Sequence, residues 1–356
     1  MNPQPVQPLR IQNRLIGSGQ PALIVAELSG NHLGSLERAR SIIDAAADAG
    51  ADAVKLQTYT ADTLTIPCDK PWFRAGTEGS IWDGMTEYEL YRSAETPFEW
   101  MAPLFEHAAS RGLICFSSPF DPTAVALLQS LDAPAYKIAS YEITDIPLIR
   151  LCARTGRPVI LATGIARPSD IRLAVDAIRA EGNDQIILLK CTSAYPTPYS
   201  AVNLRMMPGL GAEYDCLFGL SDHTPGWTVP VMAATLGACM IEKHLTLRRA
   251  DGGPDGSFSL EPEEFASLVQ EVRHAEAALG NAEYRLTPAQ EHERAVGARS
   301  LFITADIPAG TPLTQDNIRS IRPGQGLPPV RYEEILGKKA TRDLSYGEPL
   351  REGDFA

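Results

Sequence analysis

The sequence predicts an α/β protein, with a (β/α)8 TIM barrel followed by a small domain that is mostly β-structure. Short apolar runs rich in β-branched residues recur eight times within the first 280 residues, and amphipathic helical stretches separate them. This alternation is typical of parallel βα units. After residue 280 the pattern changes, because proline and glycine interrupt strand-like runs every few residues. We therefore predict a barrel at 1–280, a linker at 281–298 and the small domain at 299–356.

Each element follows from its local pattern. Helices are predicted between the strands, for example at 35–51 and 168–182, with Ser169 as the N-cap and Gly182 just past the end of the latter. The last barrel helix is predicted at 261–280. The connection at 59–96 is overlong for a compact domain, so we expect a lid or part of an interface there. The predicted strands are 22–28, 51–58, 112–118, 133–140, 157–163, 185–191, 216–222 and 238–244.

The composition argues against several classes of function. A formal net charge of −12 disfavours non-specific binding of nucleic acid. The sequence shows no signal peptide and no apolar run approaching ~18 residues, so we expect no membrane partner. Its six cysteines are scattered without a CxxC pair, as is usual in a reducing compartment. We therefore expect a cytoplasmic protein of the size of an enzyme.

Polar residues stand at the end of every predicted strand, where the active site of a (β/α)8 barrel forms. Such residues are costly to bury unpaired, so their accumulation at one face predicts a functional site. In strand order they are Glu27, Asn31 and His32; Lys55 and Gln57; Ser117 and Ser118; Lys137, Ser140 and Glu142; Thr163; Lys190, Ser193 and Tyr195; Ser221, Asp222 and His223; and Glu242, Lys243 and His244.

Two of these residues, His223 and His244, end the seventh and eighth strands, which are neighbours in a closed barrel. Their imidazoles can approach closely enough to hold a divalent metal such as Mn²⁺, Zn²⁺, Fe²⁺ or Co²⁺. The alternative is that both are hydrogen-bonded structural groups. The remaining histidines are interpreted as surface or local structural residues, namely His32, His107, His274 and His292.

Two lysines, Lys55 and Lys137, lie within apolar strands, where a lysine is rarely buried without an anion. One interpretation is a salt bridge to Glu27 or Glu142. The other is a clamp for a phosphate or carboxylate of a substrate. Hydroxyl groups would assist the clamp at Ser118, Ser140, Thr163 and Ser221.

The combination of motifs resembles the sialic acid (nonulosonate) synthase family over nearly the whole chain. In the barrel the matching motifs are VAELSGNH (25–32), DAVKLQTYTADTLT (52–65), SSPFD (117–121), YKIASYE (136–142), LATG (161–164), CTSAYPTP (191–198), GLSDHTPG (219–226) and EKHLTL (242–247). ARSL (298–301), DIPAGTPLTQDNI (306–318) and RPGQG (322–326) resemble the family's C-terminal antifreeze-like (SAF) domain.

This resemblance implies condensation of phosphoenolpyruvate with an acetamido-hexose aldehyde and water, giving a nine-carbon 2-keto acid and phosphate. His223 and His244 would bind a divalent metal, Mn²⁺ in most of the family, with Mg²⁺ or Co²⁺ as alternatives, that polarises the aldehyde. Glu27 would be the catalytic carboxylate near the metal. Residues implied to contact phosphoenolpyruvate are Lys55, Lys137, Ser118, Ser140 and Ser221. Residues implied to contact the sugar are Gln57, Glu142, Tyr195 and Asp255.

Two positions bear on details of the resemblance. Ser193 stands where the family commonly has an asparagine that contacts phosphoenolpyruvate. Arg322 matches an arginine that reaches from the C-terminal domain into the barrel of a partner subunit, which implies a domain-swapped homodimer. The alternative for 299–356 is a tethered module without a catalytic part.

Within the family, the likeness is greatest to members that use 2,4-diacetamido-2,4,6-trideoxy-L-altrose. The stretches that carry it are AELSGNH (26–32), LYRSAETPFEWMAPLF (90–105) and DGGPDGSFSLEP (251–262). The alternatives are synthesis of N-acetylneuraminate or legionaminate by the same mechanism, and a non-catalytic barrel that binds anionic sugars. A 6-deoxy sugar presents a methyl group, so Trp72, Phe73 and Trp82 are candidate apolar contacts, unless they form a small core of their own loop.

Overall fold

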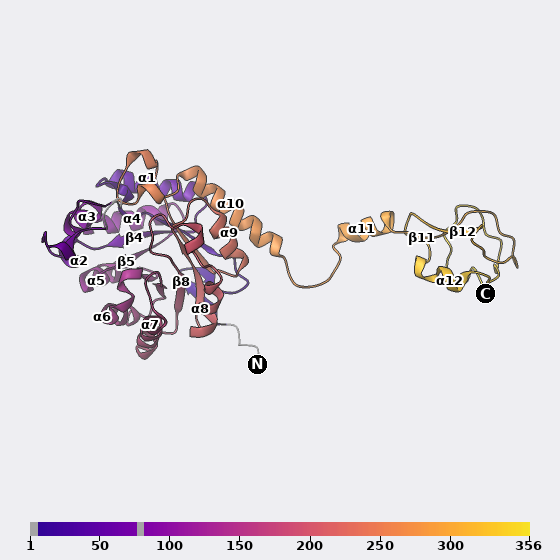
Figure 1. Ribbon diagram of the computed structural model, residues 1–356, viewed down its shortest axis with the longest axis horizontal. Helices are drawn as coiled ribbons and strands as arrows, with labels where there is room; N and C mark the ends of the chain where they lie inside the picture. The colour runs from indigo at the N-terminus through magenta and orange to yellow at the C-terminus, as the bar shows by residue number, and fades with distance from the viewer. Residues whose placement is uncertain (1–5, 77–81) are drawn as a thin grey trace. The chain divides into compact units, whose positions relative to one another are not determined.

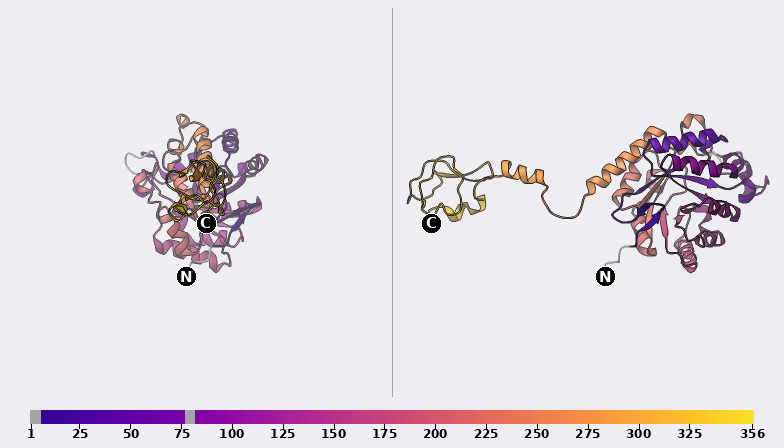
Figure 2. Two further views of the ribbon diagram at one scale, coloured as in Figure 1. Left: turned by 90° about the vertical axis from the view of Figure 1, so that its right-hand side faces the viewer. Right: turned by 180° about the vertical axis from the view of Figure 1, so that it is seen from behind.

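The computed structural model describes residues 6–76 and 82–356. Eight parallel strands close into a barrel in the order β10-β3-β4-β5-β6-β7-β8-β9, which confirms the predicted fold class. Helices surround the strands on the outside (Figure 1), and two further views show the same arrangement (Figure 2). The chain divides into two compact units, Met1–Gly280, which holds the barrel, and Asn281–Ala356.

All eight predicted barrel strands are present, shorter than the predicted runs. They are β3 Leu23–Glu27, β4 Ala53–Thr58, β5 Ile114–Pro119, β6 Tyr136–Ile138, β7 Val159–Ala162, β8 Ile186–Lys190, β9 Leu217–Asp222 and β10 Met240–His244.

Helices of the first unit cover the barrel, and several of them, such as α1 and α7, carry an amphipathic face. In α1, for example, Ser35 accepts a hydrogen bond from the Arg38 amide as the N-cap, and the buried positions Ala39, Ile42 and Ala46 recur at helical spacing. The helices are α1 Leu36–Asp48, α2 Ala61–Leu64, α3 Glu87–Ala94, α4 Phe98–Ser110, α5 Pro122–Ser130, α6 Ile146–Ala153, α7 Pro168–Ala180, α8 Met206–Tyr214, α9 Thr228–Thr235 and α10 Pro262–Leu279.

Of the two predicted ends of α7, the N-cap is wrong and the C-terminal end is confirmed. Arg167, not Ser169, is the N-cap, and the Asp170 carboxylate accepts the Arg167 amide proton. Ser169 therefore lies inside the first turn, because Pro168 occupies the first helical position, where its missing N–H costs nothing. At the other end, Gly182 follows the C-cap with φ +76°, as predicted.

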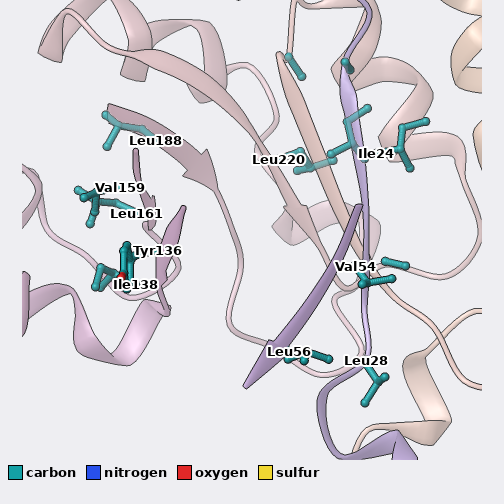
Figure 3. Close-up of a cluster of buried hydrophobic side chains, with 14 of the residues drawn as sticks. Ile24, Leu28, Val54, Leu56, Tyr136, Ile138, Val159, Leu161, Leu188 and Leu220 are labelled. Carbon is teal, nitrogen blue, oxygen red and sulfur yellow. The ribbon is translucent and has the colours of Figure 1, made fainter. Parts of the chain in front are cut away.

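Side chains alternate between two apolar layers, because successive residues of a strand point to opposite faces. The outer layer lies between strands and helices and includes Ile24, Val54 and Leu188, which Figure 3 shows on β3, β4 and β8. The inner layer fills the barrel and includes Leu23 and Ile187.

A hairpin that the sequence analysis did not predict, β1 Leu9–Ile11 paired with β2 Arg14–Ile16, packs on the inner layer. Ile11 and Ile16 are fully buried in the same cluster as Leu23. The cluster consists largely of residues from the starts of the strands, so the hairpin closes the N-terminal end of the barrel. Its strands have only three residues each, too few to show a periodic pattern.

The second unit contains an antiparallel pair, β11 Ser300–Ile303 with β12 Ile318–Ile321, around a core that includes Leu301, Leu313 and Leu350. Helix α11, Pro288–Gly297, occupies much of the segment interpreted as a linker, and α12 spans Tyr332–Ile335. Across residues 6–76 and 82–356, no helix combines the length and apolar character needed to span a membrane.

Candidate active site

A cavity of about 540 Å³ opens at the carboxyl ends of the barrel strands. It forms there because the side chains that point into the barrel change from apolar to polar along strands such as β3 and β10. In β3 the row runs from Leu23 through Val25 to Glu27, and in β10 the residues Glu242 and His244 follow Met240 with the same spacing of two. The cavity thus lies above the packed inner layer.

Two lysines and two glutamates form one buried ionic network in this cavity. Lys55 Nζ lies 2.6 Å from Glu27 Oε2 and 3.3 Å from Glu242 Oε1. Lys137 Nζ lies 3.1 Å from Glu242 Oε1, which also accepts a hydrogen bond from Ser221 Oγ at 3.0 Å. The expected salt bridge between Lys55 and Glu27 is therefore present. The partner of Lys137 is Glu242 rather than Glu27 or Glu142.

The network shifts the protonation equilibria of its members in different directions. Although burial opposes it, attraction to Lys137 and Lys55 holds the pKa of Glu242 well below its ordinary value. Burial raises the pKa of Glu27 to about 7, and the charge on Glu242 adds to this rise. Burial also lowers the pKa of Lys137, and repulsion from Lys55 adds to this fall. Two cations thus share one firmly ionised carboxylate, which leaves positive charge to attract an anion.

His223 and His244 lie side by side at the wall of the cavity, as predicted, with ring centroids 5.2 Å apart. His223 Nδ1 lies 3.2 Å from the Thr192 carbonyl oxygen, so this bond can fix the tautomer that leaves Nε2 without a proton. His244 Nδ1 is buried and finds no hydrogen-bond partner in the described part of the chain. Burial, together with the neighbouring His223, lowers the pKa of His244 well below its ordinary value.

These two imidazoles fit a divalent metal, since neutral imidazole nitrogen is a common ligand for such ions. No cluster of three or more His, Cys, Asp or Glu side chains suitable for a metal occurs among residues 6–76 and 82–356. Protein ligation would therefore rest on the histidine pair.

The residues expected to contact a sugar line the same cavity: Gln57, Glu142, Tyr195 and Asp255. Glu142 Oε2 is buried without a hydrogen-bond partner among the described residues, and burial raises the pKa of this group to about 7. Tyr195 belongs to an aromatic wall, with ring centroids 5.8 Å from Trp82 and 5.2 Å from Phe258. A buried carboxylate oxygen that has no partner among the described residues, in a cavity with aromatic rings, suits a ligand that has both hydroxyl groups and apolar faces.

The predicted hydroxyl contacts divide into two groups. Ser140 and Ser221 line the cavity, and Ser118 Oγ lies 3.4 Å from Lys55 Nζ. Thr163 does not line it, because its hydroxyl donates to the Leu189 carbonyl at 3.1 Å. Ser193 lies near Ser140, since a Cβ added to Gly164 would come within 2.3 Å of Ser193 Oγ and within 2.6 Å of Ser140 Oγ.

Three strand-end residues face the helices instead of the cavity. Ser117 Oγ lies 2.7 Å from Thr58 Oγ1, and Lys243 Nζ donates to Asp222 Oδ2 at 2.5 Å. Each differs by one position from an inward residue, so the pleat turns it outward.

The structure also places His32, the aromatic residues of the 59–96 segment and Arg322, and only some of them lie at the cavity. His32 is fully buried, with its ring edge-on to Trp100, and is a local structural residue. In the 59–96 segment Trp82 lines the cavity, whereas Trp72 is 71% exposed. Arg322 is exposed and belongs to the second unit, directly after β12.

Glu242, Cys191 and Ser29 are among the cavity residues to which the sequence analysis assigned no role. Glu242 could have been found from its spacing, since it lies two residues before His244 and hence on the same face of the strand. Ser29 and Cys191 carried no such signal.

Known proteins resemble this chain over most of its length. Residues 42–284 match the NeuB family and residues 298–356 match the SAF domain. A pseudaminic acid synthase from Campylobacter jejuni is 45% identical over 332 residues, covering 93% of this chain and 96% of that one. An N,N′-diacetyllegionaminic acid synthase from Legionella pneumophila is 37% identical over 339 residues, covering 94% of each.

Solved structures agree with this relationship. The structure of an N-acetylneuraminic acid (sialic acid) synthetase from Leptospira borgpetersenii, in complex with citrate, is 32% identical to this chain, with a TM-score of 0.72. The similarity covers 82% of this chain and 96% of that one. A family match over most of the barrel, and synthases as relatives over more than nine-tenths of the chain, exclude the interpretation as a non-catalytic barrel. The chain is an enzyme of the NeuB family, with a SAF domain at residues 298–356.

Proposed function

We propose that the enzyme condenses phosphoenolpyruvate with 2,4-diacetamido-2,4,6-trideoxy-L-altrose and water to give pseudaminic acid and phosphate. The observation that carries the proposal is the buried lysine pair beside the histidine pair, in a cavity that also has an aromatic wall. The choice of sugar rests on the higher identity to the pseudaminic acid synthase, 45%, than to the legionaminic acid synthase, 37%.

In this proposal Lys55 and Lys137 bind the phosphate and carboxylate of phosphoenolpyruvate by charge-assisted hydrogen bonds. Glu242 keeps both ammonium groups in place, since it lies within 3.3 Å of each Nζ. The hydroxyls of Ser140 and Ser221 offer further donors at the same cavity. An anion would complete the charge balance of the network, which is why binding of phosphoenolpyruvate there is favourable.

His223 and His244 would hold a divalent metal, Mn²⁺ or alternatively Mg²⁺ or Co²⁺, whose Lewis acidity polarises the sugar aldehyde. Both side chains are more than nine-tenths buried, so their imidazoles keep a fixed orientation toward the cavity. Thr192 further orients His223 by accepting the proton of Nδ1.

The reacting carbon nucleophile comes from phosphoenolpyruvate itself, whose C3 forms the new bond to the aldehyde carbon of the sugar. The aldehyde oxygen becomes a hydroxyl group. Water then adds to C2, and the bond between C2 and the phosphate oxygen breaks, which releases phosphate and leaves a ketone. Glu27 is positioned to take a proton from this water, because its Oε1 accepts no hydrogen bond from the described residues.

The sugar would lie against Gln57, Glu142, Tyr195 and Asp255, which line the cavity. A 6-deoxy sugar has a methyl group in place of a hydroxymethyl group, and the ring of Trp82 beside Tyr195 offers it an apolar contact. The indole Nε1 of Trp82 donates to the Pro254 carbonyl at 3.1 Å, which fixes the ring orientation.

A phosphate-release assay with phosphoenolpyruvate and each sugar, with Mn²⁺ and with EDTA, tests the proposal. Metal-dependent release with only the 2,4-diacetamido-trideoxy sugar is the expected result. Release with N-acetylmannosamine, or with the legionaminate precursor, would assign the enzyme to one of those branches. Release that EDTA leaves unchanged would exclude the metal, and no release with any sugar would exclude the proposed function.

We also propose a domain-swapped homodimer in which the exposed Arg322 of one subunit reaches the cavity of the other. The proposal is supported by the RPG motif that begins at Arg322, which resembles the corresponding motif of the family's C-terminal domain. Mixing an Arg322→Ala subunit with a Glu27→Ala subunit should restore activity, because one cavity of the mixed dimer would then be intact. Mixed dimers that stay inactive, or a monomeric mass in solution, would contradict this assembly. A cytoplasmic location stays a prediction.

A further inference from the structure

The carboxylate of Asp255 is held by the protein through one of its two oxygens. Ser29 Oγ donates to Oδ2 at 2.5 Å, and the Gly30 backbone N–H donates to the same oxygen at 3.4 Å. No protein donor to Oδ1 is found among residues 6–76 and 82–356. Asp255 lines the cavity, so Oδ1 is the oxygen that remains for a ligand.

The backbone that supplies these donors is itself firmly anchored. Asn31 Nδ2 donates to the Leu245 carbonyl and to Ser259 Oγ, both at 2.9 Å. Arg38 Nε donates to the Asn31 carbonyl at 2.8 Å. The short 3-10 turn at Ser29–His32 therefore has fixed positions for its donors, and it connects the end of β3 to the loop after β10.

The identity of residue 29 is not explained by its backbone. Ser29 adopts φ +48°, in the left-handed region, where glycine or asparagine would be less strained. Serine at this position is accounted for by its hydroxyl, whose partner is Asp255. The side chain also lines the cavity.

Residue 30 is a glycine because of space, not because of its backbone angles. A Cβ there would lie 2.8 Å from Pro254 Cγ and 3.0 Å from Ala94 Cβ. Pro254 directly precedes Asp255, so any side chain at position 30 would push the carboxylate away from its donors. Ala94 ends α3, and the turn at Ser29–His32 thus meets the 59–96 segment as well.

We propose that Ser29 and Gly30 are positioning residues that hold Asp255 so that its Oδ1 accepts a hydrogen bond from a hydroxyl or amide N–H of the sugar. Phosphoenolpyruvate is an anion whose phosphate and carboxylate groups offer mainly acceptors, so a carboxylate would repel it. An acetamido sugar offers both O–H and N–H donors. This inference rests on the proposed function only in taking a sugar as the ligand.

Steady-state kinetics of Ser29→Ala test the proposal. The KM for the sugar should rise about tenfold or more, because a hydrogen bond to a charged group that orients the ligand contact is lost. The kcat and the KM for phosphoenolpyruvate should stay within about twofold, as expected when uniform binding of one substrate is weakened. Gly30→Ala should change the sugar KM in the same direction. Ser267→Ala is the matched control, because Ser267 lies on α10, does not line the cavity, and donates its hydroxyl to the Glu263 carbonyl of its own helix.

A double-mutant cycle with Asp255→Ala separates positioning from a general structural role. If Ser29 acts through Asp255, Ser29→Ala has no further effect on the sugar KM in the Asp255→Ala background. Additive effects, a parallel rise in the KM for phosphoenolpyruvate, or a sugar KM within twofold of wild type would each overturn the proposal. A thermal melt of each variant shows that it is folded, and if Gly30→Ala unfolds, Ser29→Ala carries the test.

Failure of the proposed function can be told apart from failure of the coupling between Ser29 and Asp255. If the wild-type enzyme uses another acetamido sugar, the same cycle is run with that sugar, and the coupling between Ser29 and Asp255 is decided independently. If the wild-type enzyme turns over no sugar, the cycle is measured as the shift in unfolding midpoint that the 2,4-diacetamido-trideoxy sugar causes. No shift in the wild type would then overturn both proposals.

Discussion

Replacing Glu242 by glutamine should destabilise the barrel and make its stability depend more strongly on phosphoenolpyruvate. Glu242 is 3% exposed and lies within 3.3 Å of Lys55 Nζ and Lys137 Nζ. Glutamine has nearly the same shape and can still accept a hydrogen bond from Ser221, but it carries no charge. Two buried ammonium groups would then face a single carboxylate, Glu27, whose own pKa is raised to about 7.

Removing one partner of a buried ion pair costs about 3–5 kcal/mol. The retained hydrogen bond from Ser221 places Glu242→Gln near the lower value, about 3 kcal/mol. For a domain of this size each kcal/mol lowers the unfolding midpoint by roughly 2 °C, so we expect a decrease of roughly 6 °C. Saturating phosphoenolpyruvate should restore most of this loss, because its anionic groups replace the missing negative charge and binding stabilises the folded state.

Thermal unfolding followed by circular dichroism, with and without phosphoenolpyruvate, measures both effects. Glu106→Gln on the exposed face of α4 is the matched control and should leave the midpoint unchanged. A midpoint within about 1 °C of wild type would show that the lysines do not depend on Glu242. Equal stabilisation of variant and wild type by phosphoenolpyruvate would refute the idea that substrate and Glu242 compensate the same charges.

Three further perturbations test other parts of the structure. His223→Ala or His244→Ala should abolish phosphate release while a thermal melt shows an intact fold, because residues at the carboxyl ends of the barrel strands contribute little to the core. Unfolding of either variant would show instead that the two histidines are structural residues. Burial raises the pKa of Glu142 from 4.5 to about 7, so the folded state holds a proton that the unfolded state has lost, and stability falls as the pH rises between these values. Midpoints at pH 5 and pH 8 should therefore differ less in Glu142→Gln than in wild type. Ile11→Ala should lower the free energy of unfolding in urea by about 2–4 kcal/mol, and a loss below 1 kcal/mol would contradict a core role for the hairpin.

Much of the fold could be predicted because its signals are local. The eight barrel strands are mainly apolar, and most of their residues are buried, so they contrast clearly with amphipathic helices. The N-terminal hairpin escaped prediction because its burial depends on the open end of the barrel, which no local pattern shows. The Ser169 cap was wrong because Pro168 can itself occupy the first helical position, so the N-cap lies two residues earlier, at Arg167.

Part of the site followed from the same local signals. Lys55 and Lys137 stand out as lysines within apolar strands, and His223 and His244 stand out as histidines at strand ends. The barrel brings all four to one cavity. The partner of Lys137 could not be predicted, since Glu242 and Glu142 are separated from it by very different stretches of chain, and only closure of the barrel brings β6 and β10 near each other across its interior.

The sequence by itself determined the repeating strands and helices, and it determined which polar residue types stand where the strands end. Only the tertiary structure decided which of them meet. Neighbouring positions on one strand point to opposite faces, so Glu242 enters the ionic network while Lys243, one residue later, pairs with Asp222 outside the barrel. Residues far apart in the chain, such as Ser29 and Asp255, become partners because closure of the barrel places the loops after β3 and β10 side by side. The physical reason is that strand alternation is a local property, whereas the pairing of charges and donors depends on which strands adjoin.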